Sequence, residues 1–192
     1  MRLSFPLILA SGSPRRRELL EQAGYEHRVI VPSPSAECGI CSRETPPELV
    51  ARLAYQKAHN VAPQVDRGLV LACDTVAECV GQILGKPADR DHARRMLRLL
   101  RGRVHHVYSG MCLWRRPDDA KRTEVAVTRL RMDRISDEEL ERYLDSGRWR
   151  GKAGAFGYQD GLDWLHVEEG SESNVVGLPL ELLEAMIAEM AS

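Results

Sequence analysis

Residues 7–24 have the sequence LILASGSPRRRELLEQAG, which passes within a few residues from a strand pattern to a helix pattern. The apolar run predicts a buried strand over residues 6–10. Ser13 is a favourable N-cap and the proline after it suits the first helical position, so a helix is predicted over residues 14–23. Gly24 then ends the helix. A strand that leads directly into a helix is typical of α/β sheets.

The same alternation of strand and helix patterns continues along the chain. Further strands are predicted over residues 27–31, 69–78, 104–114, 123–132 and 163–168, with a hairpin return at 82–85. Further helices are predicted over residues 46–61, 88–100 and 137–145, and a last one begins at Pro179. These elements predict an α/β fold with a mixed β-sheet and flanking helices. No stretch resembles a domain linker, so residues 1–192 are expected to form a single domain.

The composition argues against several classes of protein. The 192 residues include 27 Lys and Arg against 28 Asp and Glu, so the chain lacks the basic excess that nucleic-acid binding uses. No apolar stretch is long enough to cross a membrane, and Pro6 interrupts the apolar start, which is not typical of a signal peptide. We therefore expect a protein that binds neither nucleic acid nor membrane. A contiguous strip of basic residues would instead favour nucleic-acid binding. The residues that could form it are Arg94, Arg95, Arg98, Arg101 and Arg103.

The five cysteines do not form a disulfide pattern, because their number is odd and their spacing is irregular. Cys38 and Cys41 form a C-x-x-C pair, which occurs in redox and zinc sites. This pair lies in a polar stretch, and Cys73 with Cys79 has the wrong spacing for a second zinc pair. Free thiols are the preferred interpretation, and any role of Cys38 and Cys41 stays open.

Two predicted helices carry basic residues on faces that should be apolar. In the first helix, Arg16 lies one turn before the buried leucines, with Arg15 beside it. Small residues before a helix N-terminus, followed by Arg forks, are typical of a phosphate site. In the helix over 46–61, Lys57 continues the apolar stripe that starts at Val50. The alternative in both cases is a long side chain that snorkels to solvent.

Asp74 lies inside the apolar run VLACDTVA and shares a strand face with Val70, Ala72 and Val76. A bare carboxylate on such a face is costly unless it is paired or bound to a metal. Either a buried partner satisfies Asp74, or Asp74 acts at the mouth of a cleft, where catalytic carboxylates are found.

Two lysines lie in sequences that differ from the phosphate loop of NTPases. The segments GQILGKP and GRWRGKA, which contain Lys86 and Lys152, are each one residue short and lack the Ser or Thr. Both lysines remain available as point charges near a phosphate. His105 and His106 are adjacent on a predicted strand, so they point to opposite faces and cannot jointly bind a metal.

Six segments, in order along the chain, match the pattern of one known family. They are LILASGSPRRRELLEQAG (7–24), LAYQKA (53–58), CDTVAECVGQILGKP (73–87), GRVHHVYSG (102–110), KAGAFGYQ (152–159) and SNVVGLPL (173–180). They are distributed over nearly the whole length of the chain and together resemble the Maf family of nucleotide pyrophosphatases. The resemblance implies a two-lobed α/β fold with a central cleft, of the Maf/ITPase-like kind.

The resemblance also implies a reaction, in which a nucleoside triphosphate is hydrolysed to the monophosphate and pyrophosphate with Mg²⁺ or Mn²⁺ as cofactor. It implies a cytoplasmic homodimer that removes non-canonical nucleotides. The segment KAGAFGYQ is more similar to the branch that acts on dTTP, UTP and modified pyrimidine nucleotides. The alternatives are a 7-methyl-GTP pyrophosphatase, or a regulatory nucleotide-binding protein of cell division and septum formation with little catalysis.

Residue roles follow from the same resemblance. The implied substrate-binding residues are Ser11, Ser13, Arg15, Arg16, Thr75 and Gln159. The implied catalytic residues are Asp74, as the general base, with Lys57 and Lys86. The implied metal ligands are Glu37 and Asp74.

The chain departs from the family pattern at three positions. Cys73 stands where Ala or Ser is common, and Glu37 is the single acid in a loop that usually has two adjacent acids. Asp160 follows Gln159 at a position that is more often Gly. The last departure bears on the pocket for the base of the nucleotide.

Overall fold

The computed structural model describes residues 4–36 and 44–191. Within them, seven strands form one sheet in the order β2-β1-β3-β5-β6-β7, with β4 paired to β3. Parallel and antiparallel pairs both occur, which confirms the predicted α/β class with a mixed sheet and flanking helices. Glu37, Cys38 and Cys41 lie outside the described residues, so the predictions for them remain predictions.

The chain divides into two compact units. The first comprises Met1–Asp74, Ser109–Ala126 and Gly177–Ser192, and the second comprises Thr75–Tyr108 and Val127–Val176. Three long strands contribute residues to both units; they are β3 (Gly68–Cys79), β5 (Val104–Arg116) and β6 (Lys121–Met132). The division therefore falls within strands and not in a linker.

In the first unit, β1 (Leu7–Leu9) pairs in parallel with β2 (His27–Val29) on one side and with β3 on the other. Helix α1 (Pro14–Gln22) connects β1 to β2, and α2 (Pro46–Val61) precedes β3. Helix α6 (Leu180–Ala191) ends the chain. The strand, helix, strand order predicted from the opening sequence is therefore confirmed.

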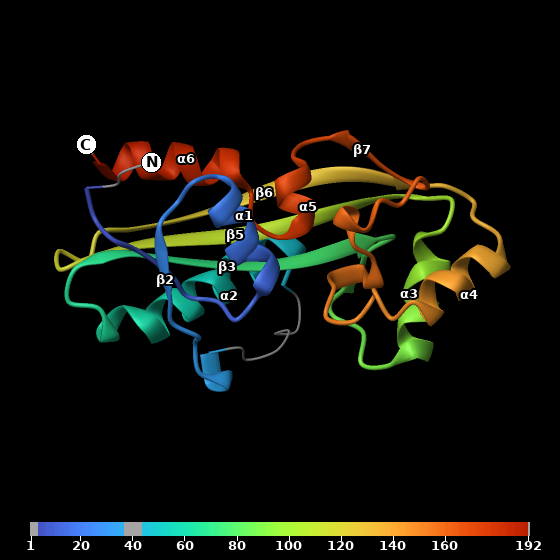
Figure 1. The fold of residues 1–192 in the computed structure, drawn as a ribbon, viewed down its shortest axis with the longest axis horizontal. Helices are drawn as coiled ribbons and strands as arrows, with labels where there is room; N and C mark the ends of the chain where they lie inside the picture. Colours follow the sequence, from blue (N-terminus) through green and yellow to red (C-terminus); the bar gives the residue numbers. More distant parts are fainter. Residues whose placement is uncertain (1–3, 37–43, 192) are drawn as a thin grey trace. The chain divides into compact units, whose positions relative to one another are not determined.

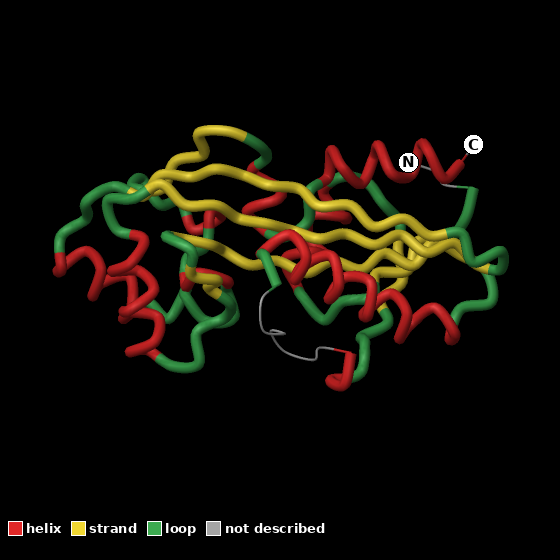
Figure 2. Tube along the Cα trace, turned by 180° about the vertical axis from the view of Figure 1, so that it is seen from behind, coloured by secondary structure: helices red, strands yellow, loops and turns green. Residues whose placement is uncertain are grey.

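Alternate residues of β1 and β3 face two different layers of helices. One face carries Leu7, Leu9 and Leu71 and packs with α1 and α6 (Figure 1). The opposite face carries Val70 and Ala72 and packs with α2, whose position is also visible from behind (Figure 2). Because side chains alternate along a strand, the position of Asp74 is on the face that α2 covers.

The second unit is built around a different set of helices. Strand β4 (Gln82–Leu84) returns antiparallel to β3, and β7 (Leu165–Glu169) pairs antiparallel with β6. Helix α3 (Arg90–Leu100) packs on α4 (Asp137–Asp145). The stripe expected for α3 is buried in this core and consists of Ala93, Met96, Leu97 and Leu100.

Capping explains where the helices of the second unit begin. The Asp89 side chain accepts a hydrogen bond from His92 N at 2.7 Å, so α3 begins at Arg90 and not at the predicted residue 88. Ser136 forms a capping box with Glu139, and α4 has the predicted bounds. The sequence did not predict α5 (Glu172–Val176), because five residues are too few to show a helical period.

Two of the five arginines that are candidates for a basic strip are paired with acids. Arg94 pairs with Asp91 and with Glu141, and Arg101 pairs with Asp137. Within residues 4–36 and 44–191, no helix is long and apolar enough to cross a membrane.

Candidate active site

A buried ion pair joins Lys57 of α2 to Asp74 of β3. Lys57 Nζ donates to Asp74 Oδ1 at 2.5 Å. The lysine side chain is 7% exposed and the aspartate side chain is 16% exposed, so the snorkelling interpretation of Lys57 is wrong. Of the two explanations offered for Asp74, the buried partner is observed, and that partner is Lys57.

Two periodicities bring this pair together. Helix α2 begins after Thr45, whose capping box with Glu48 satisfies the first turn. Its buried stripe then runs through Ala54 to Lys57, three residues later. Asp74 comes from the β3 face that the same helix covers. The pairing therefore follows from helix and strand geometry together, because each side chain is the polar member of an apolar surface.

The second carboxylate oxygen of Asp74 differs from the first. Oδ2 accepts no hydrogen bond from any of the described residues. The side chain retains enough exposure for water to reach it. A carboxylate that is held through one oxygen and open at the other can orient a water molecule and accept its proton.

Arg16 of α1 is held by two oxygen atoms. Its Nη1 donates to Ser11 Oγ at 3.2 Å, and its Nε donates to the Gly177 carbonyl at 2.8 Å. Ser13 N donates to the same Ser11 Oγ at 3.2 Å. Ser11 is buried, so one serine orients both the arginine and the turn that begins α1.

The N-terminus of α1 favours the binding of a negatively charged group. Ser13 occupies the predicted N-cap position, but its side chain makes no capping hydrogen bond, which corrects the cap expected from the sequence. The first turn contains no acidic residue, and the half-buried Arg15 lies within it. The positive end of the helix dipole and two arginines therefore act in the same small region.

The Gly177 carbonyl connects Arg16 to the region of Asp74. Cys73, the neighbour of Asp74, donates its Sγ–H to this carbonyl at 3.3 Å, and Arg16 donates to it as well. Gly177 has a φ of 123°, a conformation that favours glycine. No pattern in the sequence indicated that a backbone carbonyl would have this role.

These groups lie where the parallel pairing of β1 with β3 ends, Ser11 just after the end of β1 and Asp74 in the middle of the longer β3. Leu9 of β1 pairs with Leu71 of β3, and Ser11 and Asp74 follow shortly after these residues. Strand β1 lies between β2 and β3 in the sheet. The chain therefore runs from β1 to β2 on one side and then crosses to β3 on the other side. Ligands of open α/β sheets bind at such switch points, which favours a ligand site here.

In the second unit, the backbone joins the segments that carry Lys86 and Gln159. Gly154 N donates to the Gly85 carbonyl at 3.1 Å, which ties the turn before Lys86 to the segment KAGAFGYQ. Lys86 and Gln159 are exposed, and Thr75 is half-buried. The return of β4 onto β3 confirms that the GQILGKP segment is a hairpin and not a phosphate loop.

Lys152 is engaged by an acid of its own unit. Its Nζ donates to Asp160 Oδ1 and Oδ2, both at 2.6 Å. The Tyr143 hydroxyl donates to Asp160 Oδ2 at 2.9 Å. Burial and the Asp160 charge raise the pKa of Tyr143, so the phenol stays a donor. Sequence reasoning did not predict Tyr143; the only signal for this cluster was the departure from Gly at Asp160.

The two adjacent histidines point to opposite faces, as predicted. His105 is buried and lies edge-on to Phe156, with ring centroids 5.3 Å apart. Burial is the main cause that lowers its pKa from 6.5 to about 4. His106 is half-exposed, with Nδ1 3.5 Å from Glu78 Oε2.

The thiols in the described part of the chain are suited to packing. Cys79 and Cys112 are buried and form no disulfide, and burial raises the pKa of both. A thiol with a raised pKa is a poor nucleophile and a poor metal ligand. The free-thiol interpretation is confirmed for these two residues.

The donor set can be compared with the needs of a divalent metal. Among the described residues, no group of three or more His, Cys, Asp or Glu side chains could hold a metal ion. Mg²⁺ commonly takes one or two carboxylates, with substrate phosphates and water in the other positions. The open oxygen of Asp74 fits that kind of site, and a site made by protein groups alone is not present in this part of the chain.

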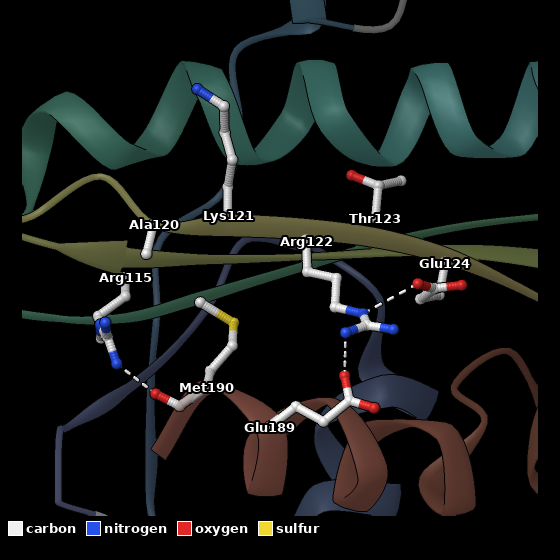
Figure 3. A pocket seen from close by; sticks show the side chains of 8 residues that line it. All are labelled: Arg115, Ala120, Lys121, Arg122, Thr123, Glu124, Glu189 and Met190. Carbon is white, nitrogen blue, oxygen red and sulfur yellow. Dashed lines mark hydrogen bonds and ion pairs between the residues drawn. The ribbon is translucent and has the colours of Figure 1, made fainter. Parts of the chain in front are cut away.

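Two cavities of the first unit are lined by other residues. A cavity of about 570 Å³ is lined by residues of β6 and α6, where Arg122 pairs with Glu124 and Glu189 (Figure 3). Arg115 reaches the Met190 carbonyl beside it. A second cavity of about 260 Å³ is lined by six residues that include Ala36 and Tyr55. Neither cavity contains a predicted site residue.

Known proteins resemble this chain over most of its length. A family model described as Maf-like protein matches residues 6–190. A dTTP/UTP pyrophosphatase of Rhodopirellula baltica is 63% identical over 182 residues, which cover 94% of this chain and 80% of that protein. Another, of Dictyoglomus thermophilum, is 40% identical over 183 residues, which cover 94% of each protein.

Among solved structures, a HAM1 protein from Coxiella burnetii aligns with 98% of this chain and 100% of its own, with 17% identity and a TM-score of 0.51. This likeness supports the fold. The family match and the identities of the relatives extend over nearly the full length. This chain therefore belongs to the Maf-like protein family.

Proposed function

We propose that this chain hydrolyses a nucleoside triphosphate between its α- and β-phosphates and releases the monophosphate and pyrophosphate, with dTTP and UTP as preferred substrates. The observation that carries the proposal is the Lys57–Asp74 pair, with one carboxylate oxygen open, just beyond the stretch where β1 and β3 pair in parallel. The names of the relatives, dTTP/UTP pyrophosphatase, support the substrate class.

Asp74 has the chemistry of a general base. Lys57 fixes its position through Oδ1, so the other oxygen is available to a water molecule near a phosphate. Proton removal makes this water a stronger nucleophile toward phosphorus, and a positioned carboxylate commonly accelerates such a step by about a hundredfold or more. Asp74 therefore orients the attacking water and accepts its proton.

The cations stabilise charge on the phosphate oxygens. Arg16 is already oriented by Ser11 and Gly177, so little ordering is needed when an oxyanion arrives. We assign Arg15 and the N-terminus of α1 to the same phosphates. Lys57 and Lys86 complete the proposed set of cations. Positive groups held in place lower the free energy of a transition state in which negative charge spreads over oxygen atoms.

A divalent cation, Mg²⁺ or Mn²⁺, completes the proposed chemistry. Asp74 would hold it together with the phosphate oxygens, and Glu37 is the second proposed ligand. When bound, the cation neutralises phosphate charge and lowers the pKa of a bound water. A homodimer and a cytoplasmic location remain predictions.

We assign substrate recognition to three further residues. Ser13 lies at the start of α1 and Thr75 directly follows Asp74. Gln159 has a side-chain amide that can both donate and accept hydrogen bonds. Pyrimidine edges with a carbonyl and an N–H, as in thymine and uracil, match such an amide. We therefore assign the choice of base to Gln159.

Turnover of a nucleotide panel tests the proposal. The wild-type chain is incubated with Mg²⁺ and, in turn, dTTP, UTP, CTP, GTP or 7-methyl-GTP, and monophosphate and pyrophosphate are measured separately. We expect equal amounts of both products, formed fastest from dTTP and UTP. Release of orthophosphate alone would contradict the proposed bond. Binding of nucleotide without any release, with Mn²⁺ as well, would favour the regulatory alternative.

A further inference from the structure

We propose that Asp160 is a positioning residue, whose carboxylate, bound to Lys152 and Tyr143, holds the turn that presents Gln159 to the base of the nucleotide. The inference rests on the proposed function, which assigns Gln159 to substrate binding. Asp160 itself touches no reacting atom in this proposal; it acts through its neighbour in the chain.

The carboxylate of Asp160 is almost fully engaged by its surroundings. Both of its oxygens accept from Lys152 Nζ at 2.6 Å, and Oδ2 also accepts from the Tyr143 hydroxyl at 2.9 Å. The side chains of Lys152 and Asp160 are 11% and 9% exposed. Charge-assisted hydrogen bonds of this length in a nearly dry site are strong and directional. They fix the side chain of Asp160 against α4.

The backbone around Asp160 is fixed as well. Asp160 N donates to the Gly157 carbonyl at 3.1 Å, and Arg148 donates to the Asp160 carbonyl at 3.0 Å. Gly161 ends the turn in the left-handed conformation, with a φ of 66°. The short 3-10 turn Tyr158–Asp160 is thereby closed at its C-terminal end.

The N-terminal residue of the same turn has its own anchor. The Tyr158 hydroxyl donates to Glu172 Oε1 at 2.7 Å, and Glu172 belongs to α5. Gln159 is therefore the exposed middle residue of a three-residue turn whose two neighbours are both tied to helices. Such an arrangement restricts the direction in which the Gln159 side chain leaves the turn.

The close packing at Gly157 shows how little freedom the ion pair has. A Cβ at this position would lie 2.2 Å from Lys152 Nζ and 2.7 Å from Asp160 Oδ2. The ammonium and the carboxylate therefore fill the space directly over the backbone of the turn. Any movement of Asp160 away from Lys152 must shift the turn that carries Gln159.

The engaged charge also determines which kinetic constant Asp160 affects. Both carboxylate oxygens of Asp160 accept hydrogen bonds from Lys152 Nζ. The Lys152 ammonium is therefore engaged by this carboxylate, and we do not assign it to the phosphates of the nucleotide. Asp160 should then influence base recognition, which appears in KM and in the preference between nucleotides. The hydrolytic step, and hence kcat, should change little.

The test compares Asp160→Asn, Gln159→Ala and the double variant in steady-state hydrolysis of dTTP and CTP. Replacing the carboxylate weakens hydrogen bonds to a charged group, so we expect KM for dTTP to rise roughly tenfold. We expect kcat to remain within about threefold and the preference for dTTP over CTP to shrink. The double variant should resemble Gln159→Ala, since a positioning residue has no effect once its target is removed.

Two probes separate positioning from general damage. Inorganic tripolyphosphate has no base, so its inhibition constant should be unchanged in Asp160→Asn. Asp145→Asn makes the same chemical change at an exposed residue of α4 and should leave the KM for dTTP as in wild type. If Asp160→Asn does not fold, Tyr143→Phe removes one hydrogen bond and keeps the ion pair, and should raise KM by about twofold to threefold.

The possible outcomes are distinct. A wild-type chain that releases no pyrophosphate would overturn the proposed function and, with it, this inference. An active wild type with additive effects of Asp160→Asn and Gln159→Ala would overturn the inference alone. So would weaker inhibition by tripolyphosphate, or a fall in kcat with KM unchanged.

Discussion

Among the described residues, each of the two units contains a largely buried Lys–Asp pair, and the two pairs differ in how many hydrogen bonds the carboxylate accepts. In the first unit, Asp74 binds Lys57 through one oxygen and leaves the other open to water. In the second, Asp160 accepts from Lys152 with both oxygens and from Tyr143 as well. The hydrogen-bond distances to lysine are nearly equal, 2.5 Å and 2.6 Å, so distance does not distinguish the two roles.

The difference lies in the unused capacity of the acid. A carboxylate whose oxygens are all occupied can only hold its neighbours, whereas a half-occupied one can also bind water or a cation. The first kind is typical of a structural or positioning role, and the second is typical of a catalytic role. A sequence alone presents both as an acidic residue close to apolar positions.

The largest expected effect is on catalysis by the first pair. Asp74→Asn keeps the shape of the side chain but removes the basic oxygen, so we expect kcat to fall by at least about a hundredfold. Asp160→Asn, the matched change in the other pair, should keep kcat within about threefold. Steady-state hydrolysis of dTTP measures both, with circular dichroism to show that each variant is folded. Similar losses of kcat in the two variants would remove the distinction.

The stability of the first pair gives the next largest effect. Lys57→Met leaves Asp74 buried without its partner, which should lower the free energy of unfolding by about 3–5 kcal/mol. Lys57→Met combined with Asp74→Leu should recover most of this loss, because two apolar side chains suit the interface with α2. Urea denaturation measures the change.

Hydrolytic activity separates a catalytic role of the Lys57–Asp74 pair from a purely stabilising one. The stable double variant is expected to remain inactive, because its base and its cation are both absent. If Lys57→Met alone unfolds no more easily than wild type, the pair contributes nothing to stability. Recovery of activity in the double variant would show that neither side chain takes part in hydrolysis.

Acidic pH should lower the stability of the second unit through His105. Its pKa in the fold is about 4, against 6.5 when exposed, mainly because of burial. The unfolded chain therefore binds more protons between these values, and stability falls as pH decreases from about 6.5 to about 4, by up to about 3 kcal/mol. His106 and Glu78 also face this region and contribute opposite, smaller influences on the same pKa.

Urea denaturation at pH values between about 4 and 7 measures this dependence. His105→Leu should flatten the dependence, whereas His106→Gln, the change at the half-exposed neighbour, should preserve it. A wild-type stability that does not vary over this range would contradict the burial argument. Loss of protection of backbone N–H groups should be greater in the second unit than in the first at the acidic end.

The smallest expected effect concerns the third hydrogen bond of Asp160. Tyr143→Phe should lower the free energy of unfolding by about 1 kcal/mol, the usual contribution of one hydrogen bond. The raised pKa of Tyr143 keeps the phenol protonated, so the contribution is complete below pH 10 and is lost only at higher pH. Stability curves of wild type and Tyr143→Phe at neutral and alkaline pH test this. Equal free energies of unfolding of the two proteins below pH 10 would contradict it.

Much of the fold was predictable because its elements carry their own local signals. Helix α2 has the predicted bounds, Pro46–Val61, because two prolines and a capping box mark its start. The nearly continuous apolar run of β3 marks a strand buried on both faces. Helix α5 and the 3-10 turn around Gln159 were missed, because short turns depend on tertiary hydrogen bonds.

The candidate site was predictable only in part. Lys57 and Asp74 were identifiable because each interrupts an apolar face, but which side chain paired with Asp74 was not. The sequence could not show that the Gly177 carbonyl would bind both Arg16 and Cys73, since these residues are far apart along the chain. Ser11 was assigned by resemblance, and its hydrogen bond to Arg16 explains why a hydroxyl is useful there.

The sequence by itself determined the order of strands and helices, the faces they bury and the family pattern, because periodicity and capping act over a few residues. Only the tertiary structure decided that Lys57 meets Asp74 and that Asp160 meets Lys152 and Tyr143. Those contacts depend on how strands and helices pack across large sequence separations. Whether an acid keeps an oxygen open or uses both is therefore a property of the packing, since burial and hydrogen-bond capacity exist only in the folded chain.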